Sequence, residues 1–308
     1  MSVQAPPSVP QTMDTRVASG VTLAIVGAFL FALKSIFIKL AFASGTDATT
    51  LLTLRLTFAL PFYVAMLVHL RRQGGPRPIS GRVAVGAVGL GFLGYYLSSY
   101  LDMAGLEFIS AQLERLTLFT YPAMIAVLAW LFLGEPLSPR ILVAIAMCYG
   151  GIFTMYSQER TWAGGDRAAW GIALVIGSAL SYSFYVMFAK KLMQRTGSRE
   201  FTCLAMLGST LFALLHFGVT HSTADLRLPA PVWVYGAVLA FVCTVIPSFL
   251  VNEAIMRIGA TRTTIIGTIG PVVTMVLAIA VLREPSSPWH FAGMALVLLG
   301  VSMVARKT

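Results

Sequence analysis

Four ionisable side chains lie well inside long apolar stretches of this 308-residue chain: Lys34, Arg55, Glu114 and Arg115. A charged side chain at the centre of a membrane helix costs roughly 2.5–3.5 kcal/mol on insertion scales, so such residues usually serve a function. At a rise of about 1.5 Å per residue, all four are expected at a similar depth, outward of their helix centres. They could recognise a charged solute, or they could form an internal ion-pair cluster that holds the helices together.

The charges of this group do not balance. Lys34, Arg55 and Arg115 set three positive charges against Glu114 alone. The remaining positive charge needs water, a backbone acceptor, or the carboxylate or phosphate of a ligand. Since adjacent helical residues point about 100° apart, Glu114 and Arg115 cannot share one direction. One is expected to face a cavity while the other braces a neighbouring helix. Lys39 is nearer the interface and can extend to water.

Uncharged polar residues are expected to line the same cavity. If the two halves of the chain are aligned, Lys34 corresponds to Tyr185 and Arg115 corresponds to Thr264, so the second half lacks these charges. This asymmetry suggests a ligand with one charged end and one less polar end. The predicted lining residues are Tyr96, Ser99, Tyr121, Tyr182, Tyr185 and Thr264.

The composition requires a lipid environment for these residues. Hydrophobic residues make up 57% of the chain and charged residues only 11%, whereas a soluble domain carries about 25% charged residues. A water-soluble fold of this size is therefore excluded. The net charge of +10 is read as attraction to anionic lipid headgroups and as a topology signal, and no nucleic-acid partner is expected.

The chain contains ten apolar segments long enough to span a bilayer, which needs about 20 residues. Residues 1–17 precede them and are expected to form a disordered cytoplasmic tail. The predicted spans are 18–43, 48–70, 83–104, 109–132, 140–157, 168–192, 201–219, 232–255, 261–282 and 289–305. The expected fold is an all-α integral membrane protein.

Lysine and arginine in the loops predict the orientation. Of the 22 such residues, four lie within predicted spans, and four (Arg160, Arg167, Arg227 and Arg283) lie in loops on one side. The remaining 14 lie on the side of the N-terminus. Both termini are therefore expected in the cytoplasm of a cell with a bacterial-type inner membrane.

The chain repeats itself. Pro122 and Pro271, Glu135 and Glu284, and three further pairs (Pro136/Pro285, Pro139/Pro288, Gly151/Gly300) share one offset of 149 residues. Residues 18–157 and 168–305 are therefore expected to be two five-helix repeats. Because five is odd, the second repeat must enter the membrane upside down. Inverted repeats are typical of secondary transporters, with a substrate site near the midplane between the halves.

Matched helix-breaking residues occur in the fourth and ninth spans. Pro122 lies in the fourth, and Gly270 and Pro271 lie in the ninth. Proline removes a backbone donor and clashes with the preceding turn, so both helices are expected to bend near the midplane. Bends at equivalent positions in both repeats suit a pair of gates.

Several of these tracts resemble a known family. The first copy runs Gly105-Leu-Glu-Phe-Ile-Ser-Ala-Gln, Tyr121-Pro122, Gly134-Glu135-Pro136 and Gly150-Gly151. The second runs Arg257-Ile-Gly-Ala-Thr, Gly270-Pro271, Arg283-Glu284-Pro285 and Gly300. Together they resemble the EamA-type repeat of the drug/metabolite transporter superfamily. The resemblance implies ten helices in a 5+5 inverted topology and alternating access.

The resemblance does not specify the substrate. We expect a secondary transporter of small organic metabolites, above all an exporter of amino acids or related zwitterions. The alternative is uptake or exchange of an anionic metabolite such as a sugar phosphate or a nucleotide-linked solute. The expected partners are the substrate, membrane lipids, and protons or a counter-substrate. A monomer and a homodimer both stay open.

An intramembrane enzyme is the remote alternative, because the chain offers no partnered histidine and no HExxH motif. Cofactors, a metal site and catalytic residues are not expected.

Overall fold

The computed structural model describes residues 11–73, 80–160, 165–258 and 260–305. All regular elements within these ranges are helices. The first half contains α1 (Gln11–Ala43), α2 (Ala48–Arg72), α3 (Gly81–Gly91), η1 (Phe92–Leu97), α4 (Ser98–Leu106), α5 (Ala111–Leu118), α6 (Tyr121–Leu133) and α7 (Pro139–Glu159). The second half contains α8 (Gly165–Thr196), α9 (Ser198–Thr220), η2 (Thr223–Leu226), α10 (Ala230–Ala240), η3 (Phe241–Val245), α11 (Ile246–Ile258), α12 (Ala260–Gly267), α13 (Ile269–Val281) and α14 (Pro288–Ala305).

The ten predicted spans all coincide with helical segments. Among the described residues, eight helical stretches are long and apolar enough to cross a membrane, and Ile269–Val281 and Pro288–Val304 are shorter apolar helices. The prediction of an all-α membrane fold with a 5+5 inverted repeat is confirmed. Helix α1 begins at Gln11 and not near residue 18, so helix replaces the end of the expected tail. Residues 1–10 lie outside the described ranges.

Residues near the helix ends explain where several helices begin. Asp47, Ser80 and Ser110 precede α2, α3 and α5, and each side chain accepts a backbone N–H from the first turn. Such caps satisfy donors that the helix itself leaves unpaired. Proline occupies the first turn of α6 and α7, where its missing N–H costs nothing.

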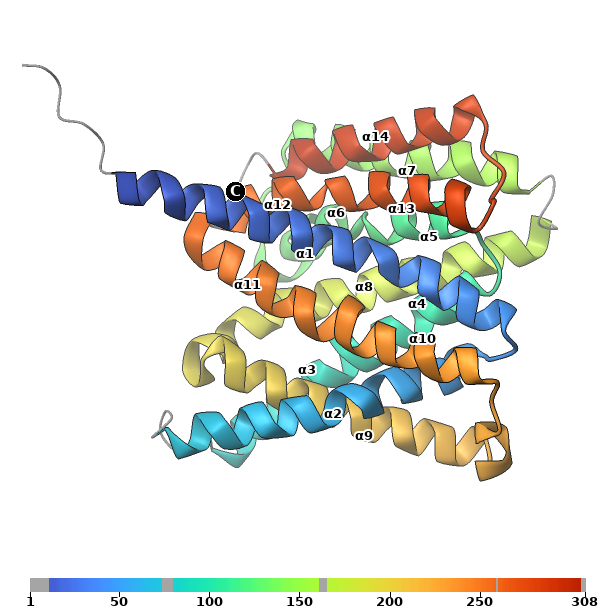
Figure 1. Cartoon of the computed structure of the whole chain (residues 1–308). Coiled ribbons are helices and arrows are strands. Elements are labelled where there is room, and N and C mark those ends of the chain that lie inside the picture. Colours follow the sequence, from blue (N-terminus) through green and yellow to red (C-terminus); the bar gives the residue numbers. More distant parts are fainter. Residues whose placement is uncertain (1–10, 74–79, 161–164, 259, 306–308) are drawn as a thin grey trace, which may run out of the picture.

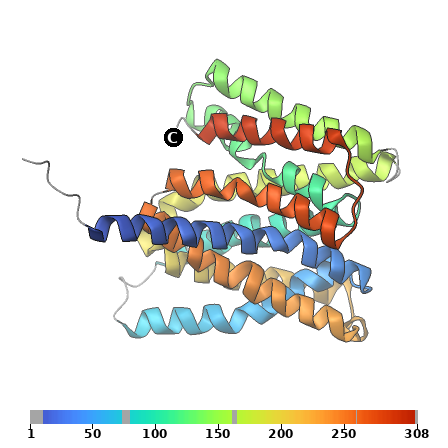
Figure 2. The same ribbon diagram turned by 45° about the horizontal axis from the view of Figure 1, so that its top comes forward.

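The two halves interlock around an approximate two-fold relationship. Helix α1 packs against α11 and α13 of the second half, and its counterpart α8 packs against α4 and α6 of the first half. Helices α2 and α9 pair at one edge of the bundle, and α7 and α14 pair at the other (Figures 1 and 2). We call the end of the bundle near both chain termini the terminal end. The distal end carries the loops that follow α1, α4, α9 and α13.

Departures from regular helix recur at equivalent positions of the repeats. The π-helical turn η1 starts at Phe92, and η3 starts 149 residues later at Phe241. A wide turn leaves carbonyl groups that must be satisfied inside a membrane protein. Ser209 donates to the carbonyl of Gly91 over 2.8 Å, and Ser181 donates to that of Leu93 over 2.7 Å. Helices α8 and α9 therefore complete the backbone pairing of the third span.

The fourth and ninth spans are both interrupted. Helix α5 ends at Leu118 and α6 starts at Tyr121, so Pro122 lies in the first turn of α6. Helices α12 and α13 meet at Thr268, shortly before Gly270 and Pro271. The proline ring therefore lies near the start of a new helix segment in both repeats.

Glycines allow close contact between the helices of the α7–α14 pair. A Cβ atom added to Gly151 would lie 2.5 Å from the carbonyl oxygen of Gly293, whereas one added to the neighbouring Gly150 would have no atom within 4 Å. The backbone cannot yield as a flexible side chain would. Gly151 is thus required by packing, and Gly150 is not.

We expect Gly151→Ala to destabilise the protein by about 1–3 kcal/mol, the usual cost of overpacking. Gly150→Ala should leave stability unchanged or raise it slightly, because alanine favours helix over glycine. The measurement is thermal unfolding of both purified variants in one detergent. Equal melting temperatures would contradict the α7–α14 contact.

Candidate functional site

The buried ionisable residues of the first half converge between α1, α4 and α5. Lys34 Nζ of α1 lies 2.5 Å from Asp102 Oδ2 of α4. Ser35, the next residue of α1, donates from Oγ to Glu114 Oε2 of α5 over 2.6 Å. Asp102 is 1% exposed and Glu114 is fully buried. The structure thus brings Lys34 and Glu114 to the same cluster. Asp102, which pairs with Lys34, was not among the predicted site residues.

The expectation that Glu114 is the only acid among these cations is wrong. Asp102 is the direct partner of Lys34, so three cations face two acids and the excess is one positive charge. Asp102 lies within the predicted span 83–104. An aspartate inside an apolar segment was therefore the signal that could have revealed it. Asp102 lies two residues before the end of that segment.

Arg55 of α2 has few partners for a buried cation. It is 5% exposed, and among the described residues it makes one hydrogen bond, a long one of 3.4 Å from Nη2 to Ser99 Oγ of α4. Its Nε and Nη1 atoms are buried without a hydrogen-bond partner. A buried donor without an acceptor is costly. The predicted neighbours Arg55 and Ser99 are thus in contact, with most of the guanidinium unsatisfied.

Arg115 points away from its neighbour Glu114, toward the ninth span. A Cβ atom added to Gly270 of α13 would lie 3.7 Å from Arg115 Nη2. Arg115 is 9% exposed, and its Nε atom has no hydrogen-bond partner. Glu114 faces α1 and α4 while Arg115 faces α13, which agrees with the divergence expected of adjacent helical residues. Gly270 leaves room beside the guanidinium.

Three of the predicted tyrosines form a chain of ring contacts. The rings of Tyr121 and Tyr182 lie 5.2 Å apart and those of Tyr182 and Tyr185 lie 5.7 Å apart, measured between centroids. The hydroxyl of Tyr185 lies 3.0 Å from that of Tyr95 on η1. Tyr121 also lies within electrostatic range of Arg115. The tyrosine chain therefore adjoins the charged cluster at its Arg115 side.

Tyr96 has different neighbours. Its ring stacks on Tyr100 at 6.4 Å and packs against Phe212 and His216 of α9. Tyr96 and Tyr100 therefore share one face of the third span, but Ser99 points elsewhere, to Arg55. Thr264 lies on α12, and its side chain is outside the described residues.

Carboxylates join the helices at the distal end. Glu284, in the loop after α13, accepts the backbone N–H of Ala111 over 2.8 Å at the start of α5. Glu159, the last residue of α7, accepts both the N–H and the hydroxyl of Ser110. The first of these contacts links the two halves. The match of Glu284 with Glu135 in the repeat did not reveal this link.

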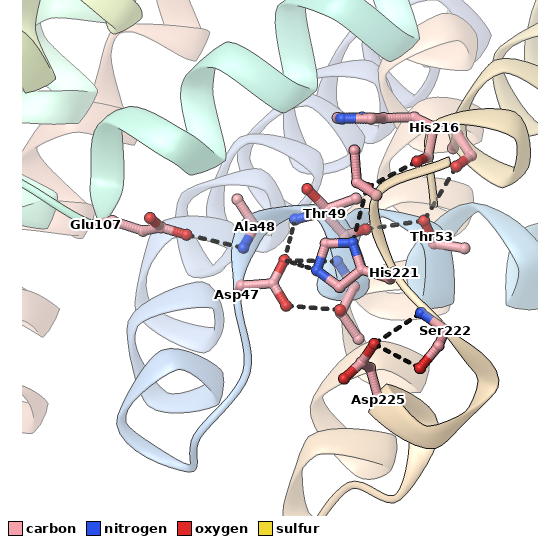
Figure 3. Close-up of polar contacts among 12 residues, drawn as sticks. Asp47, Ala48, Thr49, Thr53, Glu107, His216, His221, Ser222 and Asp225 are labelled. Carbon is pink, nitrogen blue, oxygen red and sulfur yellow. Dashed lines mark hydrogen bonds and ion pairs between the residues drawn. The ribbon is translucent and has the colours of Figure 1, made fainter. Parts of the chain in front are cut away.

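Asp47 provides a second link between the halves at the distal end (Figure 3). It accepts hydrogen bonds from Thr50 of α2, and its Oδ1 lies 3.4 Å from Nε2 of His221, which follows α9. Burial alone would raise the pKa of Asp47, but the bonds from Thr50 and the nearby His221 hold that pKa below its ordinary value. Glu107 adds a contact within the first half, accepting the N–H of Ala48 over 2.9 Å.

The groups gathered in this site are suited to charge recognition. Within the described residues, no group of three or more histidine, cysteine, aspartate or glutamate side chains could hold a metal ion. The chemistry on offer is an unsatisfied guanidinium, two carboxyl groups and a row of tyrosine rings. Such a site can bind a small polar molecule with a carboxylate.

Comparisons with known proteins assign the chain to a family. The family model described as "EamA-like transporter family" matches residues 18–157 and again residues 169–306. Uncharacterized transporter YcbK of Bacillus subtilis (strain 168) is 28% identical over 276 residues, which cover 86% of each chain. An Archaeoglobus fulgidus protein named "Uncharacterized transporter" is 26% identical over 220 residues, covering 71% of this chain and 76% of its own length.

A solved structure supports the fold independently. It aligns with a TM-score of 0.62 over 94% of this chain and 98% of its own, at 16% sequence identity. At that identity the likeness concerns the fold alone. The family match covers both halves of the ten-span architecture, and this chain therefore belongs to the EamA-like transporter family.

Proposed function

We propose that the protein is a secondary transporter that exports small zwitterionic metabolites, such as amino acids, by alternating access. The observation that carries this proposal is Arg55, a buried guanidinium with two nitrogens unpartnered. Its planar fork of donors matches a carboxylate, with which it can form two parallel hydrogen bonds. A bound carboxylate would remove the cost of burying these donors unpaired.

The charge of the cluster favours a zwitterion over a phosphate. With both acids ionised, Lys34, Arg55 and Arg115 exceed Asp102 and Glu114 by one positive charge. The carboxylate of a zwitterion places one negative charge beside the unpaired guanidinium without changing the net charge of the cluster, whereas a doubly charged phosphate would reverse the sign of that charge in a site shielded from water. The acids also supply acceptors for an ammonium group. The tyrosine chain beside Arg115 can accommodate the less polar remainder of the ligand.

We expect Arg55→Gln to weaken binding of the transported acid by about 10- to 100-fold, the value of a charge-assisted hydrogen bond. Binding of the corresponding carboxamide should change little, because it carries no negative charge. The measurement is a thermal-shift and calorimetric screen of the purified protein against L-amino acids and their amides.

Arg257→Gln is the matched control, since Arg257 pairs with Glu253 in an accessible position. It should leave both affinities unchanged. Equal losses for acid and amide in Arg55→Gln would mean that Arg55 supports the helices and does not recognise the substrate. A cation as the only bound species would also contradict the charge argument.

The inverted repeat suggests how the two ends alternate. Glu284 reaches from the second half to the start of α5 at the distal end. In the first half, Glu135 holds the equivalent place, and its N–H bonds to Ala129 as that of Glu284 bonds to Ala278. Yet the side chain of Glu135 is exposed at the terminal end. When the halves exchange conformations, Glu135 should bind the start of α12 as Glu284 now binds α5.

We expect Glu284→Ala to favour opening of the distal end by about 1 kcal/mol, the value of a lost helix cap, or roughly fivefold in population. Electron–electron distance measurements between spin labels at Phe108 and Ser286 should then show a larger fraction of long separations. Adding Glu135→Ala should reverse the shift, because it removes the cap of the other conformation. If Glu135→Ala leaves the distances of the Glu284 variant unchanged, the two caps do not exchange.

We also propose that the terminal end faces the cytoplasm, on the basis of the bias in loop lysine and arginine. The three native cysteines are buried, so single new cysteines report cleanly. A membrane-impermeant thiol reagent added to intact cells should label Asp225→Cys. It should label Glu135→Cys only after the membrane is opened. Labelling of both positions from one side would contradict the inverted topology.

A further inference from the structure

Two buried carboxyl groups, Asp102 of α4 and Glu114 of α5, lie beside each other, because their partners Lys34 and Ser35 are consecutive residues of α1. Each uses one oxygen in a strong contact: Asp102 Oδ2 with Lys34 Nζ at 2.5 Å, and Glu114 Oε2 with Ser35 Oγ at 2.6 Å. The second oxygen of each group, Asp102 Oδ1 and Glu114 Oε1, is buried without a hydrogen-bond partner. The pair therefore contains two unsatisfied acceptors.

An ionised carboxylate can only accept hydrogen bonds. Two ionised carboxylates in contact would repel each other and leave both oxygens unsatisfied, whereas a single proton turns one oxygen into a donor to the other. We propose that Asp102 and Glu114 hold one shared proton between Oδ1 and Oε1, and that this proton is exchanged for the substrate. The exchange of this proton for the substrate rests on the proposed transport function.

The surrounding charges do not replace this proton. Arg55 donates to Ser99 and not to either acid, while Arg115 extends toward Gly270. Lys34 is engaged with the other oxygen of Asp102. The titratable and charged groups that lie within electrostatic range of the pair or of its cations are Lys34 and Lys39 of α1, Arg55 and Tyr63 of α2, Arg115 of α5, Tyr121 of α6 and Cys243 of η3.

A substrate ammonium group would compete with the proton for the same two oxygens. An ammonium carries three N–H donors, and that of Lys34 already binds this carboxyl pair at Oδ2. When a second ammonium binds, the O–H bond breaks, the proton passes to water on the open side, and N–H···O bonds replace it. One positive charge takes the place of another. Substrate and proton therefore exclude each other, as antiport requires.

Infrared spectroscopy of the purified protein tests the shared proton without any substrate. The wild type should show the C=O stretch of a protonated carboxyl near neutral pH. Asp102→Asn and Glu114→Gln should each remove the same component of the band, because the new amide N–H donates to the remaining carboxylate in place of the proton. Glu135→Gln and Asp225→Asn, which change carboxyl groups outside the cluster, should leave the band unchanged.

The outcomes discriminate between assignments. Loss of that component in Glu114→Gln alone would place the proton on Glu114 and overturn sharing, and absence of the component from the wild type would overturn the proposal. If Asp102→Asn fails to fold for lack of a partner for Lys34, Lys34→Gln/Asp102→Asn removes both charges together and gives the same readout.

The exchange step has a separate test in proteoliposomes that contain a trapped pH indicator, with L-amino acids as the probes. The wild type should move protons opposite to the amino acid, and Glu114→Gln should transport without proton movement or not at all. Proton movement retained in Glu114→Gln would overturn exchange at this pair. An intact band with no amino-acid flux in the wild type would leave the shared proton standing and reject the proposed substrate class.

Discussion

The structure depends on the cost of placing charge and unpaired backbone in lipid. A buried ion must be paired or neutralised, and the cluster between α1, α4 and α5 meets that demand incompletely. Lys34 and Asp102 satisfy each other. Arg55 does not find an acid, and one oxygen each of Asp102 and Glu114 finds no donor. The cluster therefore contains both unpaired donors and unpaired acceptors. A bound zwitterion could pair with both kinds of group, and so could a carboxylate together with a proton.

The same constraint explains the irregular helices. A π-helical turn or a break frees carbonyl groups, and these are tolerated only where the protein provides donors. Ser181 and Ser209 provide them around η1, and Thr244 bonds the carbonyl of Leu239 across η3. Irregular backbone therefore occurs where the third and eighth spans meet helices of the opposite half. These spans carry Ser99 and Asp102 in one repeat and Cys243 near Arg55 in the other.

Much of the fold follows from composition and repetition, because bilayer thickness dictates span length and the offset of 149 residues dictates symmetry. The pairing within the site was less accessible. Lys34 and Glu114 stood out as charges in apolar segments, but their depth was estimated from segment centres. That estimate did not include Asp102, which lies close to the end of its segment. The hydrogen bond that the N–H of Ala111 donates to Glu284 joins the two halves. It depends on how the repeats pack against each other, and that packing cannot be read from the spacing of residues in the sequence.

The two repeats share their backbone conformation but differ in their charged side chains. Gly134 adopts a left-handed conformation with φ of 69°, and Arg283, its equivalent, adopts one with φ of 54°. For a residue with a Cβ atom that conformation costs about 1–2 kcal/mol. In the first repeat glycine forms this turn without strain. In the second repeat Arg283 adopts the same turn at that cost, and the turn places Glu284 against the start of α5. In the proposed transport cycle, the symmetric turns serve the exchange between two conformations. The charges of the cluster lie in one repeat, and we propose that they give the ligand the same orientation in both conformations.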